Sequence, residues 1–479
     1  MRRLISLAAA SASVLSILTP TVRVAAAEPA FVLRQPRTEI EAYRDPGSGQ
    51  ATIELPLWIE ARAAAFELHV GRSDTRDPIA AIWQSPNGPR TLPTESVRSW
   101  RDYGLTGFFD LTIRGRARDA IRHRRVSWCP NSYSRTRLGP GADPSVYPQA
   151  CGGNPFTRWQ IWGIERGWGV GTDAYATFKL KPGHYSLEVR IPKAYRDALD
   201  LGPTLQTYEL TVRDGYGYPY PPKPPHPFAG DGRGLGSPPN GPRSIGKQAP
   251  TSTTLGTDDP STMPDLAALP AWAVRLESYG GQEVLSFAAT VWNAGPAPLV
   301  VEGYRRGDEP IMDAYQVFGD EQYSSVGTFE FDAQDGHDHW HFLDFARYQL
   351  LRADEQLIVR SQKEAFCLAP TDAEDLLVPG ATWRPEVIGF SECGYVDSLS
   401  IREVLQAGWG DTYFQSLPGQ SFDVTGLADG DYLIEVTANP DGNLYDVSTA
   451  NDRALREITL SHDARGRRRV TVAPYLGPL

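Results

Sequence analysis

The sequence predicts a mainly β protein built from two β-sandwich-like domains that are joined by a Pro/Gly-rich linker. Short stretches in which apolar and polar residues alternate, such as 51–58 and 184–191, are typical of strands with one buried face. The 45 glycines and 40 prolines favour many turns over long helices. With 479 residues the chain is too long for one ordinary domain, and its composition changes sharply near residue 215.

Residues 28–214 are predicted to form the first domain. Further alternating stretches lie at 65–70 and 205–212, and one short helix is expected at 192–199. Short strands separated by turn residues are typical of a β-sandwich. The role of this domain is open. Its middle, 128–168, is rich in aromatic residues and glycine, so it could bind carbohydrate or a protein partner, or could be an irregular loop held by a disulfide.

Residues 215–263 are predicted to be a linker that leads into a second domain at 264–479. The proline tract at 216–227 should be extended and semi-rigid, and the Gly/Ser/Thr/Pro-rich part that follows should be flexible. After the linker, alternating stretches at 284–292 and 431–438 again predict strands.

The first 27 residues resemble a secretory signal peptide. Arg2 and Arg3 precede an apolar run from Leu4 to about Leu18, and three alanines at 25–27 offer a cleavage site. The apolar run is short and interrupted, which argues against a membrane anchor, and no other stretch is long and apolar enough to span a membrane. We therefore expect a secreted, extracellular protein.

Charge and cysteine content narrow the class of protein further. A net charge of −11 argues against nucleic acid as a partner, because phosphate binding needs Lys/Arg surfaces. The four cysteines allow three pairings. We favour Cys129–Cys151 and Cys367–Cys393, because each pair then lies within one predicted domain. Each bridge would close a loop of about two dozen residues and contribute on the order of 3 kcal/mol.

Three of the eight histidines, His337, His339 and His341, lie within five residues of one another. Residues at positions i, i+2 and i+4 of a strand line one face, so the three imidazoles would gather while Asp338 and Trp340 point away. Such a set suits copper, zinc, nickel or iron, among which Cu(II) binds nitrogen ligands most tightly. A single core histidine with two bystanders is the alternative.

Two further stretches accompany the histidines. One is Ser-Gln-Lys-Glu-Ala-Phe-Cys-Leu at 361–368, and the other is Gly-Trp-Gly-Asp-Thr-Tyr at 408–413, which is followed by Asp-Val-Thr and Gly-Asp-Tyr within 423–432. In this order and spacing, the motifs together resemble the catalytic domain of the lysyl oxidase family. The resemblance covers about residues 264–460, a little under half of the chain.

The resemblance implies a role for each matched residue. His337, His339 and His341 would bind copper, and Lys363 and Tyr413 would form lysine tyrosylquinone, a cross-linked cofactor. A quinone supplies an electrophilic carbonyl that no ordinary side chain has. The implied activity is oxidative deamination of a primary amine, such as a peptidyl lysine, by O₂ to give an aldehyde, ammonia and hydrogen peroxide.

The general base and a second metal site are less firmly indicated. Asp344 and Asp338 are the candidate bases near the histidines, and Asp344 is preferred because Asp338 should face away from the metal. Animal members of the family carry a calcium site, and oxygen ligands suit Ca²⁺. The corresponding positions here are Asp265, Leu266, Asp446, Ser448, Asn451 and Asp452. Ser448 replaces a carboxylate, so a polar turn before the last strands is the alternative.

Some features of the sequence depart from the family and leave two other functions open. The second domain has only two cysteines, Arg347 stands where the family has a histidine, and the first domain does not resemble the corresponding animal regions. A non-catalytic secreted metal-binding or adhesion module is one alternative, but the presence of both Lys363 and Tyr413 argues against it. A zinc metalloenzyme is the other, and it would give Lys363 no role.

Overall fold

A computed structural model describes the chain outside its first 28 residues, its last two residues and several internal segments, the longest of which is 216–246. The signal-peptide prediction, most of the predicted linker, and His337, Asp338 and Lys363 lie outside the described residues. The described ranges are 29–115, 121–132, 134–215, 247–319, 322–333, 339–361, 365–385, 393–414 and 420–477.

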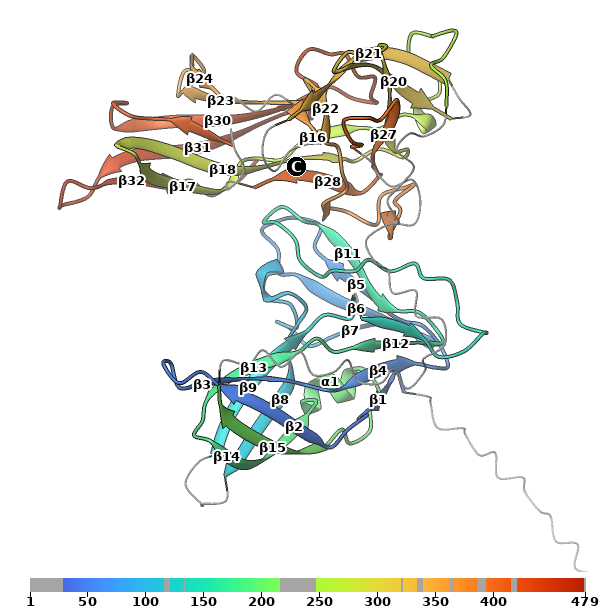
Figure 1. Ribbon diagram of the computed structural model, residues 1–479, viewed down its shortest axis with the longest axis vertical. Coiled ribbons are helices and arrows are strands. Elements are labelled where there is room, and N and C mark those ends of the chain that lie inside the picture. Colours follow the sequence, from blue (N-terminus) through green and yellow to red (C-terminus); the bar gives the residue numbers. More distant parts are fainter. Residues whose placement is uncertain are drawn as a thin grey trace, which may run out of the picture.

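The protein is mainly β, as the sequence predicts (Figure 1). Within the described ranges, helical structure is limited to α1 (Lys193–Ala198), close to the predicted 192–199, and two 3₁₀ turns, η1 (Trp100–Asp102) and η2 (Pro260–Thr262). No described helix is long and apolar enough to cross a bilayer.

Three sheets form the N-terminal half. A seven-stranded sheet has the order β13-β3-β2-β15-β14-β8-β9, in which only β15 and β2 run parallel among the described pairs. Two four-stranded sheets have the orders β1-β4-β12-β10 and β11-β5-β6-β7. The strands are β1 (Val32–Arg34), β2 (Glu39–Arg44), β3 (Gln50–Glu54), β4 (Trp58–Ala61), β5 (Phe66–Gly71), β6 (Ala80–Ser85), β7 (Gly88–Thr91), β8 (Leu105–Gly115), β9 (Ile121–Trp128), β10 (Arg135–Arg137), β11 (Trp159–Ile164), β12 (Trp168–Gly171), β13 (Tyr175–Lys179), β14 (Gly183–Arg190) and β15 (Gln206–Asp214).

Three further sheets form the C-terminal half. Their orders are β16-β18-β28-β26, with β17 and β29 also paired to β18; β25-β22-β21-β20-β19-β27; and β24-β23-β30-β31-β32. The strands are β16 (Leu266–Ala268), β17 (Trp272–Tyr279), β18 (Gln282–Asn293), β19 (Leu299–Arg305), β20 (Ile311–Phe318), β21 (Gln322–Asp332), β22 (His339–Leu343), β23 (Ala346–Arg352), β24 (Leu357–Arg360), β25 (Ala365–Phe366), β26 (Asp372–Ala373), β27 (Ser400–Leu405), β28 (Trp409–Tyr413), β29 (Ser421–Asp423), β30 (Gly430–Ala438), β31 (Arg453–His462) and β32 (Arg468–Val472).

Each half has its own apolar core. Strand β20 shows why: its side chains alternate strictly between buried and partly exposed positions, so one face is available for packing. Aromatic rings fill the N-terminal core, where Phe108 and Trp128 lie 4.7 Å apart between ring centroids. The C-terminal core contains Trp340 and Phe287, and it also takes in Tyr147 from the N-terminal half. The two halves therefore pack against each other rather than merely sharing a chain.

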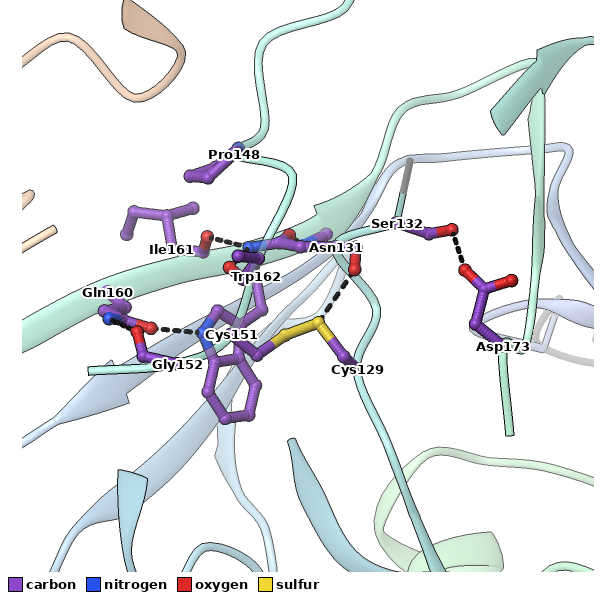
Figure 2. The surroundings of a disulfide bond; sticks show 12 residues. Cys129, Asn131, Ser132, Pro148, Cys151, Gly152, Gln160, Ile161, Trp162 and Asp173 are labelled. Atoms are coloured by element: carbon purple, nitrogen blue, oxygen red, sulfur yellow. Dashed lines mark hydrogen bonds between the residues drawn. A yellow bond between two sulfur atoms is a disulfide. The ribbon is translucent and has the colours of Figure 1, made fainter. Parts of the chain in front are cut away.

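Both predicted disulfides are present, Cys129–Cys151 and Cys367–Cys393. Figure 2 shows the first of them beside the Asn131 side chain. The Asn131 amide donates to the carbonyls of Ala150 at 2.8 Å and Ile161 at 3.1 Å, so it ties the disulfide loop to β11.

The aromatic residues around this disulfide belong to packed interiors. Trp128, Tyr147, Phe156 and Trp162 are all buried. They therefore do not form a surface on which a sugar ring could stack, and the irregular loop held by a disulfide is the interpretation that their burial favours.

The described end of the predicted linker, 247–263, lies against the C-terminal half. The Gly256 amide donates to Ser324 Oγ at 2.8 Å, and the Thr254 amide donates to the Tyr323 carbonyl at 2.8 Å. Gly256 has a φ of +69°, and a Cβ there would come within 2.6 Å of the Tyr445 ring. A glycine is thus required for this close approach.

Candidate active site

Strand β22 carries two of the three predicted copper ligands. Its side chains alternate, so His339 and His341 share one face while Trp340 and Phe342 enter the core on the other. Trp340 is fully buried, and its indole N–H donates to the Tyr395 carbonyl at 2.8 Å. Trp340 therefore anchors the strand and leaves the imidazoles in register on the opposite face.

The His339 and His341 imidazoles converge. Their Nε2 atoms lie 3.0 Å apart, and the rings are nearly perpendicular, at 86°. Two imidazole nitrogen atoms that lie this close together could both bind one copper ion. The two imidazoles thus fit a copper ion; His337, the third predicted ligand, lies outside the described residues.

Asp332 is a functional candidate that sequence reasoning missed. It lies on β21 directly opposite His339, and its Oδ2 is 3.7 Å from Nδ1 of His341. A carboxylate on the far ring nitrogen of a ligating histidine orients the imidazole and increases its basicity. Asp332 precedes the histidines by only a few residues, but nothing in the sequence shows that the chain turns back to place it beside them.

The Cys367–Cys393 disulfide lies beside β22. This strand pairs with β25, with Phe342 opposite Phe366 and Leu343 opposite Ala365, and Cys367 is the residue that follows β25. The Trp340 amide donates to the Cys393 carbonyl at 2.8 Å. The disulfide therefore joins two segments that both contact the histidine strand.

Tyr413 reaches the same place from the end of β28. Its hydroxyl accepts a hydrogen bond from the Cys367 amide at 3.0 Å and donates to the Cys367 carbonyl at 3.2 Å. The Phe366 ring packs against it edge to face, with centroids 4.9 Å apart. Cys367 thus follows the strand that pairs with β22 and also binds the Tyr413 hydroxyl. Lys363, four residues before Cys367, lies outside the described residues.

The environment of Tyr413 keeps its hydroxyl protonated. Burial raises the pKa of Tyr413 well above its usual range, and the nearby carboxyl groups of Asp411 and Glu403 raise it further. Any reaction that needs the phenolate must therefore be assisted by a cation, because a positive charge is what favours the ionised form.

Glu403 is a second residue that the sequence did not indicate. It is fully buried on β27, and one of its oxygens accepts a hydrogen bond from the Leu368 amide at 2.8 Å. Its other oxygen, Oε1, has no hydrogen-bond partner among the described residues. Burial raises the pKa of Glu403 well above the usual range. Glu403 lies near the two cysteine sulfurs, but the disulfide prevents these from acting as thiolate ligands.

Asp344, the preferred candidate for the general base, lies in the turn between β22 and β23. It is half-buried and has a positive φ of 59°, a conformation that Asp tolerates better than most residues. The turn keeps Asp344 next to the histidine strand but outside its regular alternation. Its role as a base remains a prediction.

Most of the predicted calcium ligands meet in one place. We call Asp265, Asp446, Asn451 and Asp452 the acidic turn. The Asn451 amide donates to Asp265 Oδ1 at 3.1 Å, and the Val447 amide donates to the Pro264 carbonyl at 2.9 Å, which joins the start of the half to its late acidic segment. Ser448 lies in this segment, where its hydroxyl accepts a hydrogen bond from the Ala450 amide.

The electrostatics of the acidic turn favour a cation. Burial, together with Asp265, raises the pKa of Asp446 to about 6, and burial, together with Asp446 and Asp265, raises that of Asp452 to about 7. Three buried oxygens, Asp446 Oδ2, Asn451 Oδ1 and Asp452 Oδ1, have no hydrogen-bond partner among the described residues. Oxygen atoms without partners and mutually repelling carboxylates are what a bound Ca²⁺ would satisfy.

Comparison with known proteins confirms the resemblance over part of the chain. Residues 323–468 match the lysyl oxidase family, a span that includes the histidines, Lys363, Tyr413 and Asp446 to Asp452. The chain is similar to lysyl oxidase homolog 3B of Danio rerio, with 28% identity over 116 residues, and to homolog 2A of Danio rerio, with 29% over 116 residues. Homolog 4 of Mus musculus is 26% identical over 117 residues. Each match covers 24% of this chain and only 12 to 14% of the relative.

Proposed function

We propose that this protein is a secreted copper-dependent amine oxidase that converts primary amines, such as peptidyl lysine, to aldehydes with release of ammonia and hydrogen peroxide. The observation that carries the proposal is the meeting of two elements at Cys367. Its backbone binds the Tyr413 hydroxyl, and it directly follows β25, which pairs with the strand in which the His339 and His341 nitrogens converge. The match of 323–468 to the lysyl oxidase family supports the same chemistry.

The residues would divide the work as follows. His337, His339 and His341 would hold copper, and Lys363 and Tyr413 would form lysine tyrosylquinone. When present, copper and lysine tyrosylquinone supply an electrophilic carbonyl for amines and a redox centre for O₂. The protein contributes the position of the Tyr413 ring, fixed by Phe366 and Cys367, and the orientation of His341, to which Asp332 contributes. Asp344 would take the proton from the carbon next to the amine nitrogen.

Calcium is proposed as a structural ion in the acidic turn. The turn joins Asp265, near the start of the C-terminal half, to Asn451, just before β31. An ion here would stabilise the fold of the oxidase half rather than take part in the reaction. Ser448 would contribute a hydroxyl, and Leu266 its backbone carbonyl, to a coordination sphere of oxygen atoms.

The test compares Tyr413→Phe with a matched control, Tyr304→Phe. Tyr304 is also buried in the C-terminal half, but its hydroxyl donates to Glu302 and not to Cys367. After copper loading in air, we expect quinone absorbance and amine-dependent peroxide release from the unmodified protein and from Tyr304→Phe. Both signals should be absent from Tyr413→Phe and from Lys363→Arg.

Peroxide release that survives Tyr413→Phe would rule out the proposed mechanism. Copper binding can be followed separately, because Tyr413→Phe leaves the histidines intact and should retain the metal. A panel of primary amines, including lysine-containing peptides, would then define the substrate class by the rate of peroxide release.

A further inference from the structure

A short segment of the C-terminal half extends a sheet of the N-terminal half. The Arg158 amide donates to the Glu374 carbonyl at 2.7 Å, and the Leu376 amide donates to the Trp159 carbonyl at 2.7 Å. This makes a parallel bridge between Trp159 and Asp375 at the beginning of β11. The two halves are thus joined by backbone hydrogen bonds as well as by side chains. In Figure 1, β11 lies at the edge of the N-terminal half that faces β28.

The side chain of Glu374 is enclosed at this junction. It is 2% exposed. Its two oxygens accept hydrogen bonds from the side-chain amide of Asn154 and, at 3.2 Å, from the hydroxyl of Thr157. No basic side chain among the described residues forms an ion pair with it, so both donors that it uses are neutral. Burial raises the pKa of Glu374 well above the usual range, and Asp372 adds to this effect.

The turn that binds Glu374 is held in place by contacts within the N-terminal half. The backbone amide of Asn154 donates to Thr157 Oγ1 at 3.0 Å, and the backbone amide of Phe156 donates to Asn154 Oδ1 at 2.8 Å. The Trp100 indole, from the N-terminal core, donates to the Thr157 carbonyl at 3.2 Å. Asn154 and Thr157 are therefore fixed by their own half, and Glu374 is the group that they position.

Glu374 also contacts strand β28, which ends at Tyr413. The Glu374 amide donates to the Gly408 carbonyl at 2.9 Å, and β26 pairs with β28 through Ala373 opposite Trp409. A Cβ at Gly410 would come within 3.2 Å of the Glu374 side chain, so this side chain is in close contact with strand β28. Tyr413 is three residues further along the same strand.

The segment that contains Glu374 also contains the residue that binds the Tyr413 hydroxyl. Cys367, with its two hydrogen bonds to Tyr413, lies seven residues before Glu374. Midway between them, the Thr371 hydroxyl accepts a hydrogen bond from the Thr412 amide at 2.8 Å. Segment 367–376 therefore contacts the Tyr413 ring system at one end and the N-terminal half at the other.

We propose that the N-terminal half positions Tyr413: Asn154 and Thr157 hold Glu374, and through Glu374 they fix both segment 367–376 and strand β28. Without this contact, strand β28 and the Cys367 backbone are no longer held in one position relative to each other. The Tyr413 ring is then less often in the geometry needed for cross-linking. The positioning is a property of the fold, while its consequence for cross-linking rests on the proposed function.

Two contacts elsewhere in the junction support docking in this orientation. The Tyr147 and Trp383 rings stack at 6.0 Å with an interplanar angle of 13°. Phe156 packs edge to face on Tyr475 and lies 6.0 Å from the Arg456 guanidinium, measured to the ring centroid. These contacts hold the C-terminal half in the same orientation as the Glu374 contact does, and the Glu374 contact is the one next to the start of strand β28 that carries the proposal.

The test replaces Asn154 by Asp, which sets a carboxyl group against Glu374. We expect amide hydrogen exchange at 371–376 and 409–413 to be accelerated at least tenfold in Asn154→Asp. The double variant Asn154→Asp/Glu374→Gln exchanges the acid and amide between the two positions and should restore the slow exchange. Tyr195→Phe is the control: it removes a buried hydrogen bond to the Thr106 carbonyl inside the N-terminal half, and it should leave both segments unchanged.

Exchange at 409–413 that stays slow in Asn154→Asp, while exchange at 154–160 accelerates, would overturn the proposal. A double variant that is no slower than Asn154→Asp would overturn it as well. If Asn154→Asp does not fold, Thr157→Val removes one donor without adding charge, and it should accelerate exchange at 409–413 about threefold.

A second readout links the contact to cofactor formation. After copper loading in air, the fraction of the Tyr413 peptide that is cross-linked should fall at least fivefold in Asn154→Asp and recover in the double variant. If the unmodified protein forms no cross-linked peptide, the proposed function fails, whereas the exchange measurements still decide whether the N-terminal half positions Tyr413.

Discussion

Glu374 and the acidic turn both place carboxyl groups away from water in the C-terminal half, but their partners differ. Glu374 is bound by two uncharged donors, the Asn154 side-chain amide and the Thr157 hydroxyl. In the acidic turn, Asp265 raises the pKa of Asp446, Asp446 and Asp265 raise that of Asp452, and buried oxygens have no hydrogen-bond partner among the described residues. The first environment suits a fixed contact between the two halves; the second suits a divalent cation.

Removing calcium should have the largest effect on stability and should act only through the acidic turn. A ligand at a concentration one hundred times its dissociation constant stabilises a protein by about 2.7 kcal/mol. We therefore expect the melting temperature in millimolar calcium to fall clearly when a chelator is added. Thermal unfolding with and without calcium measures this difference.

Paired variants separate the two environments. Asp446→Asn/Asp452→Asn should abolish the calcium response and should raise stability in calcium-free buffer, because it removes the repulsion between carboxylates. Glu374→Gln should leave the calcium response intact. If the unmodified protein melts at the same temperature with calcium and with the chelator, the acidic turn is only a polar turn.

Truncating Glu374 should have the next largest effect. Glu374→Ala leaves the Asn154 amide and the Thr157 hydroxyl without an acceptor in a buried junction, at a cost of about 1–3 kcal/mol. Glu374→Gln keeps an acceptor for Asn154 and should cost much less. Urea unfolding of the two variants measures the difference. Equal losses in both would mean that the contact depends on the negative charge of Glu374 and not only on an acceptor for Asn154.

The pH dependence of stability should show the acidic turn directly. A carboxyl group with a raised pKa in the folded protein binds its proton more tightly there than in the unfolded chain, so its contribution is complete at low pH and is lost as the pH rises. For Asp446 and Asp452, with pKa values of about 6 and about 7, the loss falls between about pH 4 and pH 7. Without calcium, the unfolding free energy of the unmodified protein should decline over this window relative to that of Asp446→Asn/Asp452→Asn. A constant difference between the two proteins would contradict the raised pKa values.

Local patterns in the sequence were sufficient for part of the structure. Strand alternation predicted the β class, and the period of two placed His339 and His341 on one face with Trp340 on the other. The observed pairing of the cysteines is the one favoured because each pair lies within one predicted domain. These features depend on residues close together in sequence, so the sequence contains the information directly.

Contacts between distant segments were not predictable in this way. Asp332 comes beside His341 because β21 pairs with β22. Glu403 comes near Tyr413 although their strands, β27 and β28, belong to different sheets. The Asn154–Glu374 contact joins residues 220 positions apart. Asn154 and Glu374 look like ordinary surface residues in the sequence, but both are buried where the two halves meet.

The smallest expected effect would refine the calcium side of the comparison. Ser448 stands where the family resemblance implies a carboxylate, and its hydroxyl accepts a hydrogen bond from the Ala450 amide at 3.3 Å. In Ser448→Asp a carboxylate can accept the same hydrogen bond and offer its second oxygen to the ion. Because ligand charge tunes calcium affinity, we expect the dissociation constant to fall on the order of tenfold, measured by calorimetric titration. Ser448→Asn, which has the same shape without the charge, is the matched control and should change affinity little. Unchanged affinity in Ser448→Asp would place residue 448 outside the coordination sphere and leave Asp265, Asp446, Asn451 and Asp452 as the side chains that hold the ion.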